Sequence, residues 1–481
     1  MKLSELIAGL NVKQIIGNTN VEIKEVKTDS NFVSEGDLFI CISGGNFDGH
    51  DFVQQAMYYG ASAIVTEKEL QISLPQVIVE DSRIAMSVVA SNFYGHPDKK
   101  LKIIGVTGTN GKTTTTHIIK KILDLSGIKS GIIGTLGAFY GDKFIEPTLT
   151  TPDPLTLYKI LKDMLEDGVE IVAMEVSAHS LALDKLYGIQ FEVAVFTNFT
   201  QDHLDYFKSM DEYKKAKLKL FSEFVCKYKV LNADDENYKD FLTASNESIS
   251  YGIFSPSDVF AMDIKDEGDR SKFILNLFDC VYRVELKLKG EFNVYNALAA
   301  VTAVSVVGVR VDDAVYGLEN ISVVSGRMER VYSNGFSVYV DYAHTPDGLQ
   351  KALSTLKTPE NRLVCVFGCG GNRDKTKRKI MGEISGKFAD FTIITSDNPR
   401  FEEPMDIIYE IEDGIAKVNK NYVAIQDRSQ AIEYAINHAK KGDVILVAGK
   451  GSENYQDILG IKHVFKDKDI IEEIIRGKSG D

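Results

Sequence analysis

The chain has 481 residues, of which 44% are hydrophobic and 26% charged, a composition ordinary for a globular protein of roughly three domains. This apolar content excludes a mainly disordered chain, and the 38 Gly and 10 Pro follow no period, which excludes a collagen-like protein. The net charge of −14 argues against a general nucleic-acid or anionic-membrane binder, so local groups must hold any anionic ligand.

The N-terminus and the cysteines indicate the compartment. The chain starts without a basic region followed by a long apolar run, so we expect no signal peptide. No run approaches the roughly 18 apolar residues of a membrane span. The five cysteines are odd in number and scattered, and for Cys365 and Cys369 two buried thiols are favoured over a metal or redox pair. We therefore expect a cytoplasmic protein without a disulfide framework.

Residues 1–98 predict a small α/β unit, with short strands near 37–42 and 63–65 and a helix near 51–59. The polar run 96–100 separates this unit from the next. We place the first domain boundary there, because the pattern changes to longer apolar strands.

Residues 99–328 predict a second α/β unit built on a mostly parallel sheet. Apolar strands at 101–106, 171–174 and 193–196 alternate with helices such as 113–125, a pattern typical of a sheet covered on both faces. The segment 260–288 alternates more and predicts an antiparallel appendage at the sheet edge.

Residues 329–481 predict a third, doubly wound unit. The expected strands and helices alternate through it, and loops at the strand ends carry the informative residues. The strands are expected at 337–340, 363–367, 391–394 and 444–447, and helices at 407–418 and 429–439. The predicted fold is therefore α/β with three domains: an N-terminal unit, a central P-loop domain and a C-terminal Rossmann-like domain.

A glycine-rich loop between the strand at 101–106 and its helix predicts a phosphate site. Such a loop wraps phosphate with backbone N–H groups, places Lys112 on the outer phosphates and offers the Thr113 hydroxyl to Mg²⁺. The helix N-terminus adds partial positive charge. Val106 stands where the usual spacing has glycine, so the loop is a variant. A turn with an incidental lysine is the alternative, but the order of strand, loop, lysine, hydroxyl and helix favours phosphate.

Carboxylates and a histidine follow the neighbouring strands. Glu175 ends one strand beside the loop and is well placed to hold Mg²⁺, although a solvated loop position would also explain it. His203 lies between Asp202 and Asp205, either of which could orient its ring. Lys217 belongs to a lysine-rich run, which by itself predicts only a solvated helix face.

Motifs spread over the whole chain resemble one family. They are Gly108-Thr109-Asn110-Gly111-Lys112-Thr113-Thr114, Glu175-Val176-Ser177, Asn198 to Asp205 with Tyr213-x-x-Ala216-Lys217, Asn293-x-x-Asn296, Ser325-Gly326-Arg327-Met328-Glu329 and Asp341-Tyr342-Ala343-His344-Thr345-Pro346. In these motifs the chain resembles the Mur ligases, the ATP-dependent amide-forming enzymes of peptidoglycan precursor synthesis. Thr150-Thr151-Pro152 and Ser396-Asp397-Asn398-Pro399-Arg400 resemble the branch that adds the third residue of the peptide.

The resemblance implies three domains, for the UDP-linked substrate (1–98), ATP (99–328) and the incoming amino acid (329–481). It implies ATP and Mg²⁺, with Lys217 carbamylated by CO₂ so that it becomes an extra carboxylate. The implied catalytic residues are Lys112, Glu175, His203 and Lys217, and the metal residues are Thr113, Glu175, His203 and carbamylated Lys217. The implied ATP-binding residues are Gly108, Thr109, Asn110, Gly111, Lys112, Thr113, Thr114, Asn293, Asn296, Arg327, Asp341, Tyr342 and His344.

The resemblance also implies the residues that hold the other two substrates. Those for the UDP-linked substrate are Ser30, Thr150, Thr151, Ser177 and Lys185. Those for the amino acid are Arg373, Asp397, Asn398, Pro399, Arg400, Gly449 and Glu453. Lys185, Asn31 and Ser452 depart from the family pattern, which often has Arg, Arg and His there; a lysine keeps the charge but loses the bidentate fork.

The implied reaction joins meso-diaminopimelate to UDP-MurNAc-L-Ala-D-Glu through an acyl phosphate. Arg400 suits the distal carboxylate of diaminopimelate and Glu453 its ammonium, whereas L-lysine would leave the arginine unpaired. The alternatives are the same ligation with L-lysine, a folylpolyglutamate-type ligase, and a P-loop switch or kinase without ligase activity. We expect a monomer that binds neither nucleic acid nor membrane.

Overall fold

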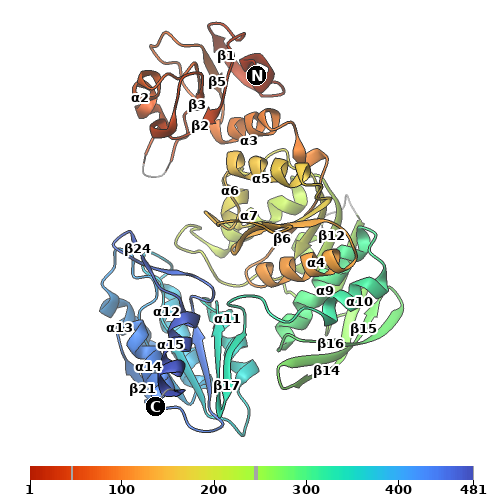
Figure 1. Cartoon of the computed structure of the whole chain (residues 1–481), viewed down its shortest axis with the longest axis vertical. Coiled ribbons are helices and arrows are strands. Elements are labelled where there is room, and N and C mark those ends of the chain that lie inside the picture. The colour runs from red at the N-terminus through yellow and green to blue at the C-terminus, as the bar shows by residue number, and fades with distance from the viewer. Residues whose placement is uncertain (45–46, 243–246, 480–481) are drawn as a thin grey trace.

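The computed structural model describes residues 1–44, 47–242 and 247–479, which form three sheets flanked by helices and one small hairpin. Figure 1 shows the N-terminal unit at the top, the central unit below it and the C-terminal unit at the lower left. This mixed α/β architecture with largely parallel sheets confirms the predicted fold class. No helix in the described ranges is long and apolar enough to cross a membrane.

The N-terminal unit is a five-stranded sheet in the order β1-β5-β4-β3-β2. Only β1 runs antiparallel to its neighbour. Its elements are α1 Leu3–Leu6, β1 Val12–Ile16, β2 Val26–Lys27, η1 Ser30–Phe32, β3 Leu38–Ile40, η2 Gly49–Phe52, α2 Val53–Tyr58, β4 Ala63–Thr66, β5 Gln76–Val79 and α3 Ser82–Phe93. Ala90 of α3 shares a buried cluster with Leu157 and Leu161, which joins this unit to the central one.

The central unit is an eleven-stranded sheet in the order β16-β15-β14-β13-β12-β11-β6-β10-β7-β8-β9. Its strands are β6 Lys102–Thr107, β7 Ser130–Gly134, β8 Gly137–Tyr140, β9 Lys143–Ile145, β10 Ile171–Glu175, β11 Phe191–Phe196, β12 Cys226–Asn232, β13 Glu247–Gly252, β14 Val259–Glu267, β15 Arg270–Leu277 and β16 Cys280–Leu286. Its helices are η3 Pro97–Lys99, α4 Lys112–Leu125, α5 Pro154–Glu166, α6 Ala178–Ala182, α7 Met210–Ser222, α8 Tyr238–Phe241, α9 Glu291–Val306 and α10 Val311–Glu319.

Both faces of the central sheet are covered, which explains its continuous apolar strands. Along β6, Ile104 packs into the cluster formed with α4, α9 and α10, and Ile103 packs into the cluster formed with α5. Strands β14 to β16 are antiparallel at the edge, so the prediction for 260–288 is confirmed. Strand β6 lies between β10 and β11, and connections that leave such a point in opposite directions open a crevice at the carboxyl ends of the strands.

The C-terminal unit is a six-stranded sheet in the order β17-β18-β22-β19-β20-β21, antiparallel only at β17. Helices α11, α12 and α13 cover one face and α14 and α15 the other. The elements are β17 Glu329–Asn334, β18 Phe336–Asp341, α11 Pro346–Leu356, β19 Leu363–Phe367, α12 Thr376–Phe388, β20 Phe391–Ile394, α13 Pro404–Ile415, β21 Tyr422–Ala424, α14 Arg428–Asn437, β22 Val444–Ala448, β23 Tyr455–Ile458, β24 Ile461–Val464 and α15 Asp467–Ser479. Cys365 and Cys369 are buried free thiols here, and Cys369 lies 3.8 Å from the Met381 sulfur.

Candidate functional site

A cavity of about 1000 Å³ opens at the carboxyl ends of the central strands and reaches the C-terminal unit. The P-loop, the end of β10 and the loop after β11 supply one wall. The C-terminal unit supplies Tyr342, His344 and Arg373 to the other wall. Thus the cavity gathers predicted residues that lie more than 250 positions apart in the chain, from Thr109 to Arg373.

The P-loop needs glycine at two positions. Gly108 and Gly111 have φ of +149° and +91°, and a Cβ on Gly108 would lie 1.9 Å from the Thr197 hydroxyl. The side chain of Lys112 folds back and donates to the carbonyls of Gly108 at 2.9 Å and Thr109 at 2.8 Å. Burial lowers the pKa of Lys112. These contacts leave an ammonium group at the position where this loop class holds phosphate.

Asn198, which follows β11, fixes the conformation of the P-loop. Its Oδ1 accepts from the Asn110 N–H at 2.9 Å, and its Nδ2 donates to the Asn110 carbonyl at 3.0 Å. Its carbonyl accepts from the Thr109 N–H at 2.8 Å. We assigned no role to Asn198 from the sequence, although its place just after a strand next to β6 is a usable signal.

Glu175 is 1% exposed and accepts three hydrogen bonds. The donors are the Thr113 hydroxyl at 3.0 Å, the Thr135 N–H at 2.8 Å and the Thr135 hydroxyl at 3.1 Å. Arg327 donates to the same Thr113 hydroxyl at 2.9 Å, and its guanidinium lies 4.2 Å from the ring centre of Tyr342. A carboxylate, a hydroxyl and an arginine therefore meet directly beside the P-loop lysine.

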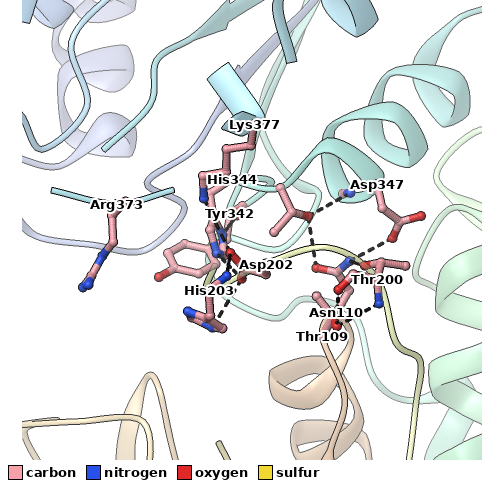
Figure 2. Close-up of polar contacts among 12 residues, drawn as sticks. Thr109, Asn110, Thr200, Asp202, His203, Tyr342, His344, Asp347, Arg373 and Lys377 are labelled. Atoms are coloured by element: carbon pink, nitrogen blue, oxygen red, sulfur yellow. Dashed lines mark hydrogen bonds and ion pairs between the residues drawn. The ribbon is translucent and has the colours of Figure 1, made fainter. Parts of the chain in front are cut away.

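Asp202 links the central unit to the C-terminal unit. Figure 2 shows its carboxylate among His203, His344 and Lys377, at 3.3, 3.5 and 3.6 Å respectively. Asp202 is 5% exposed; burial raises its pKa, but the hydrogen bond from His344 and the nearby cations hold it well below its usual range. Burial lowers the pKa of His203 to about 3, so its ring is neutral near neutral pH. Of the two carboxylates that flank His203 in sequence, Asp202 is the one that contacts it.

The other flanking carboxylate, Asp205, pairs with Arg373 of the C-terminal unit at 3.3 Å. A third link joins the P-loop to the C-terminal unit, because Asn110 donates to the Asp347 carboxylate at 2.8 Å. Figure 2 shows this contact beside Thr109 and Thr200. The sequence did not single out Asp347 or Lys377, because a contact between two folded units leaves no periodic pattern in either.

Lys217 points inward from α7. It is 1% exposed, donates to the Gly108 carbonyl at 2.7 Å and lies 4.6 Å from the Tyr213 ring centre. Burial, and then the charge of Lys112, lower the pKa of Lys217 well below its usual value. The solvated face that the lysine-rich run predicts is therefore wrong at this position.

The predicted metal residues supply oxygen and imidazole donors. Within the described ranges, no group of three or more His, Cys, Asp or Glu side chains is arranged to hold a metal ion. Thr113 and Glu175 offer the oxygen ligands that Mg²⁺ prefers. A lysine ammonium cannot be a ligand, so Lys217 could join this set only as a carboxylate.

The predicted nucleotide residues beyond the P-loop line the cavity or support it. Asn296 lines it, and its amide donates to Asn293 at 3.1 Å; Asn293 lies outside the lining. Asp341 accepts from two backbone N–H groups, and burial raises its pKa. Tyr295 donates to Asp234 at 2.7 Å on the same wall, a pair that the sequence reasoning missed.

Four of the five residues predicted for the UDP-linked substrate line the same cavity, namely Thr150, Thr151, Ser177 and Lys185. Thr151 donates to the Glu175 carbonyl at 2.8 Å, which places this group next to the P-loop. Burial lowers the pKa of Lys185. Ser30 lies in the N-terminal unit outside this lining and donates to Gln55 at 2.9 Å.

The residues predicted for the amino acid form a second group, in the C-terminal unit, of which only Arg373 reaches the cavity lining. Asn398 donates to Glu453 at 2.9 Å. Gly449 has φ of +112°, and a Cβ there would lie 2.7 Å from Asp397. Arg400, at φ +53°, donates to the Gly371 carbonyl at 2.7 Å. Pro399 lies between Asn398 and Arg400 in this turn.

A buried ion pair holds the two loops of this second group. Arg428 and Asp467 are both 0% exposed at the side chain and lie 2.7 Å apart. Arg428 also donates to the carbonyls of Ser396 at 3.4 Å and Ala448 at 2.9 Å. These residues directly precede Asp397 and Gly449, so one guanidinium fixes the start of both loops.

Comparisons with known proteins agree with these motifs. Residues 22–103 match the Mur ligase family, catalytic domain; residues 106–304 match the Mur ligase middle domain; residues 326–451 match the Mur ligase, glutamate ligase domain. A protein of Clostridium acetobutylicum named UDP-N-acetylmuramoyl-L-alanyl-D-glutamate–2,6-diaminopimelate ligase 1 is 46% identical over 485 residues, 99% of each chain. A Caldanaerobacter subterraneus ligase named for the same two substrates is 44% identical over 99% of each chain.

Solved structures show the same architecture. A structure of UDP-N-acetylmuramoyl-L-alanyl-D-glutamate–2,6-diaminopimelate ligase superposes with a TM-score of 0.70 at 29% identity, covering 100% of this chain and 99% of that one. The MurF ligase of Thermotoga maritima in complex with ADP has a TM-score of 0.65 at 21% identity, over 95% and 97% of the two chains, and shows the fold alone. Because relatives 46% and 44% identical match 99% of its length, the chain belongs to the Mur ligase family.

Proposed function

We propose that this chain is the ATP-dependent ligase that joins meso-diaminopimelate to UDP-MurNAc-L-Ala-D-Glu through an acyl phosphate. The observation that carries the proposal is the single cavity in which the P-loop, the Thr150–Thr151–Ser177–Lys185 group and Arg373 meet. The names of full-length relatives support the two substrates.

The P-loop side chains suit the phosphoryl transfer. Lys112 turns from the Gly108 and Thr109 carbonyls toward the γ-phosphate, and Arg327 approaches from Thr113. The terminal carboxylate oxygen of the dipeptide attacks the γ-phosphorus, the bond to the β-bridging oxygen breaks, and ADP leaves. Two cations from the chain oppose the charge that spreads over the transferring group.

The metal site rests on a modified lysine. Burial disfavours the ammonium form of Lys217, and its uncharged Nζ is a nucleophile toward CO₂: the N–C bond forms, a proton leaves, and a carbamate results. Thr113, Glu175, His203 and this carbamate would hold Mg²⁺, which when bound offsets the negative charge of the phosphates. The low pKa of His203 keeps an imidazole lone pair available as a ligand.

The acceptor residues suit a diamino acid with a distal carboxylate. Arg400 and Asn398 offer donors to that carboxylate, and Glu453 accepts from the ammonium beside it. The other amine attacks the acyl carbon, the bond to the phosphate oxygen breaks, and the amide, phosphate and a proton are released. The residues divide as 1–98 for the UDP moiety, 99–328 for ATP and 329–481 for the amino acid, in a monomer.

The test is phosphate release from ATP and Mg²⁺ with UDP-MurNAc-L-Ala-D-Glu and one of three acceptors: meso-diaminopimelate, L-lysine or none. We expect release only with diaminopimelate. Preference for L-lysine would keep the ligase and overturn the role of Arg400. Release that is indifferent to any amine would overturn the ligase and favour a P-loop switch or kinase.

A further inference from the structure

A lysine that the proposed function does not use lies among the residues predicted for the amino acid in the C-terminal unit. Lys450, two residues after β22, is 0% exposed. Its Nζ donates to Asn398 Oδ1 at 2.9 Å and to Glu453 Oε2 at 2.9 Å, and it lies 5.6 Å from the Tyr455 ring centre. A charge this deeply buried is costly unless it is paired, so its partners explain its place.

These contacts fix the orientation of the Asn398 amide. Oδ1 accepts from Lys450 and from the Asp457 N–H at 3.0 Å, both of which are donors only. The amide nitrogen must therefore face the other way, where it donates to Glu453 Oε2 at 2.9 Å. A 180° flip would set a donor against two donors and leave the Glu453 oxygen without this bond.

The same contacts divide the two oxygens of Glu453. Oε2 accepts from both Lys450 and Asn398, whereas no hydrogen bond from any described residue reaches Oε1. The Glu453 side chain is 23% exposed, and Oε1 is its oxygen without a hydrogen-bond donor among the described residues. Lys450 thus holds one oxygen so that the other keeps a fixed direction.

We infer that Lys450 is a positioning residue of the amino-acid subsite, acting through Glu453, to which Asn398 also donates, without touching the substrate. The inference rests on the proposed ligase function. Without the lysine, the Glu453 side chain keeps its charge, but it is no longer held in one rotamer and it is more exposed to solvent. The ammonium of the incoming amino acid then meets a mobile carboxylate, and its binding weakens.

The test is steady-state kinetics of Lys450→Met, with Lys357→Met as the matched control. Lys357 pairs with Asp390 near the amino ends of β19 and β20. Lys450 follows the carboxyl end of β22, so the two lysines lie at opposite ends of the strands of this sheet. We expect K450M to raise the KM for diaminopimelate about tenfold, with KM for ATP and for the UDP substrate within about twofold of the parent values. K357M leaves all three unchanged.

A double-mutant cycle with Glu453→Gln separates positioning from a general structural effect. If Lys450 acts through Glu453, K450M/E453Q has the KM for diaminopimelate of E453Q alone. Independent, multiplied effects in the double variant, or a parallel rise in all three KM values of K450M, would overturn the inference. Lys450→Gln, which keeps a hydrogen-bond donor, takes the place of K450M in the cycle should the methionine variant not fold.

The kinetics distinguish failure of the proposed function from failure of the inference about Lys450. An unmodified protein that does not ligate diaminopimelate refutes the function before any variant is compared. An unmodified protein that ligates it, together with a K450M variant of unchanged KM, refutes only the role of Lys450.

Discussion

Lys217 shows how burial changes what a side chain can do. A lysine run predicts a solvated face, yet this side chain turns into the protein beneath the Gly108 carbonyl. Desolvation disfavours the charged form and so favours the uncharged, nucleophilic amine. The residue matters to our account as a carboxylate precursor and not as a cation.

We expect activity to depend on dissolved CO₂. Assays in degassed, bicarbonate-free buffer should lose at least about tenfold in kcat, and added bicarbonate should restore it, because the carbamate is reversible and supplies a metal ligand. Lys217→Arg, which cannot form the carbamate, should have little activity in either buffer. Equal activity of the unmodified protein with and without bicarbonate would contradict the modification.

His117 gives a prediction about stability and pH. Burial, with Arg327 and Lys120 nearby, lowers its pKa to about 4, against about 6.5 in an unfolded chain. Between these values the unfolded chain binds a proton that the folded chain does not, so stability falls as pH falls through this window. In urea unfolding of the ligand-free protein, the loss between about pH 7 and 5 should be about 2 kcal/mol smaller in His117→Gln. An equal loss in both proteins would show that His117 titrates normally.

Some residues of the site could be predicted from the sequence and others could not. Lys112 and Glu175 stand at positions fixed by local patterns, a loop before a helix and a strand end, and both line the cavity. Asn198 follows a strand, but its role and that of Lys450 depend on which loops fold against them. Their burial and partners emerge only from the tertiary structure.

At the scale of elements, the order of strands decides where the site forms. Strand β6 lies between β10 and β11, so the loops after all three strands meet at one edge. Period and composition predicted these strands well, because strands buried on both faces are continuous apolar runs. The order in which the strands pair could not be predicted from the hydrophobic pattern of the sequence, because any of the apolar strands could neighbour β6.

The buried Arg428–Asp467 ion pair gives a prediction about the two loops that start at Asp397 and Gly449. Asp467→Asn leaves Arg428 buried without its counter-charge and should destabilise the C-terminal unit by about 3–5 kcal/mol. Glu472→Gln, which breaks an exposed pair with Arg476 on the same helix, should cost at most about 1 kcal/mol. Denaturant unfolding followed by circular dichroism measures both. Equal, small effects would show that the buried pair does not hold the loops.

At the scale of the whole molecule, the central and C-terminal units are joined by charged contacts around the cavity. Asp202 meets His344 and Lys377, and Asn110 meets Asp347 (Figure 2). Asp205 meets Arg373. None of these pairs was predictable as a pair, because each couples two units whose relative placement is not encoded in local sequence. They bring Arg373 of the C-terminal unit into the same cavity as the P-loop.

Lys377→Met should separate nucleotide binding from turnover. Lys377 is 7% exposed at the side chain and neutralises Asp202 across the two units. Its loss should lower kcat about tenfold by weakening the contact between the central and C-terminal units, with ATP affinity within about twofold of the parent. Lys375, directly before the helix α12 that carries Lys377, is exposed and pairs with Glu402. Lys375→Met should leave kcat unchanged. Titration calorimetry measures the ATP affinity and initial rates measure kcat. An unaltered kcat in K377M would show that this pair does not contribute to turnover.

The central claim is that ATP activates the substrate carboxylate before the amine attacks. UDP-MurNAc-L-Ala-D-Glu labelled with ¹⁸O in its terminal carboxylate tests this most directly, in a reaction with ATP, Mg²⁺ and meso-diaminopimelate. An acyl phosphate requires that one labelled oxygen leave with each phosphate released, and we predict that mass spectrometry finds it there. Phosphate free of ¹⁸O, formed alongside the amide product, would contradict the mechanism.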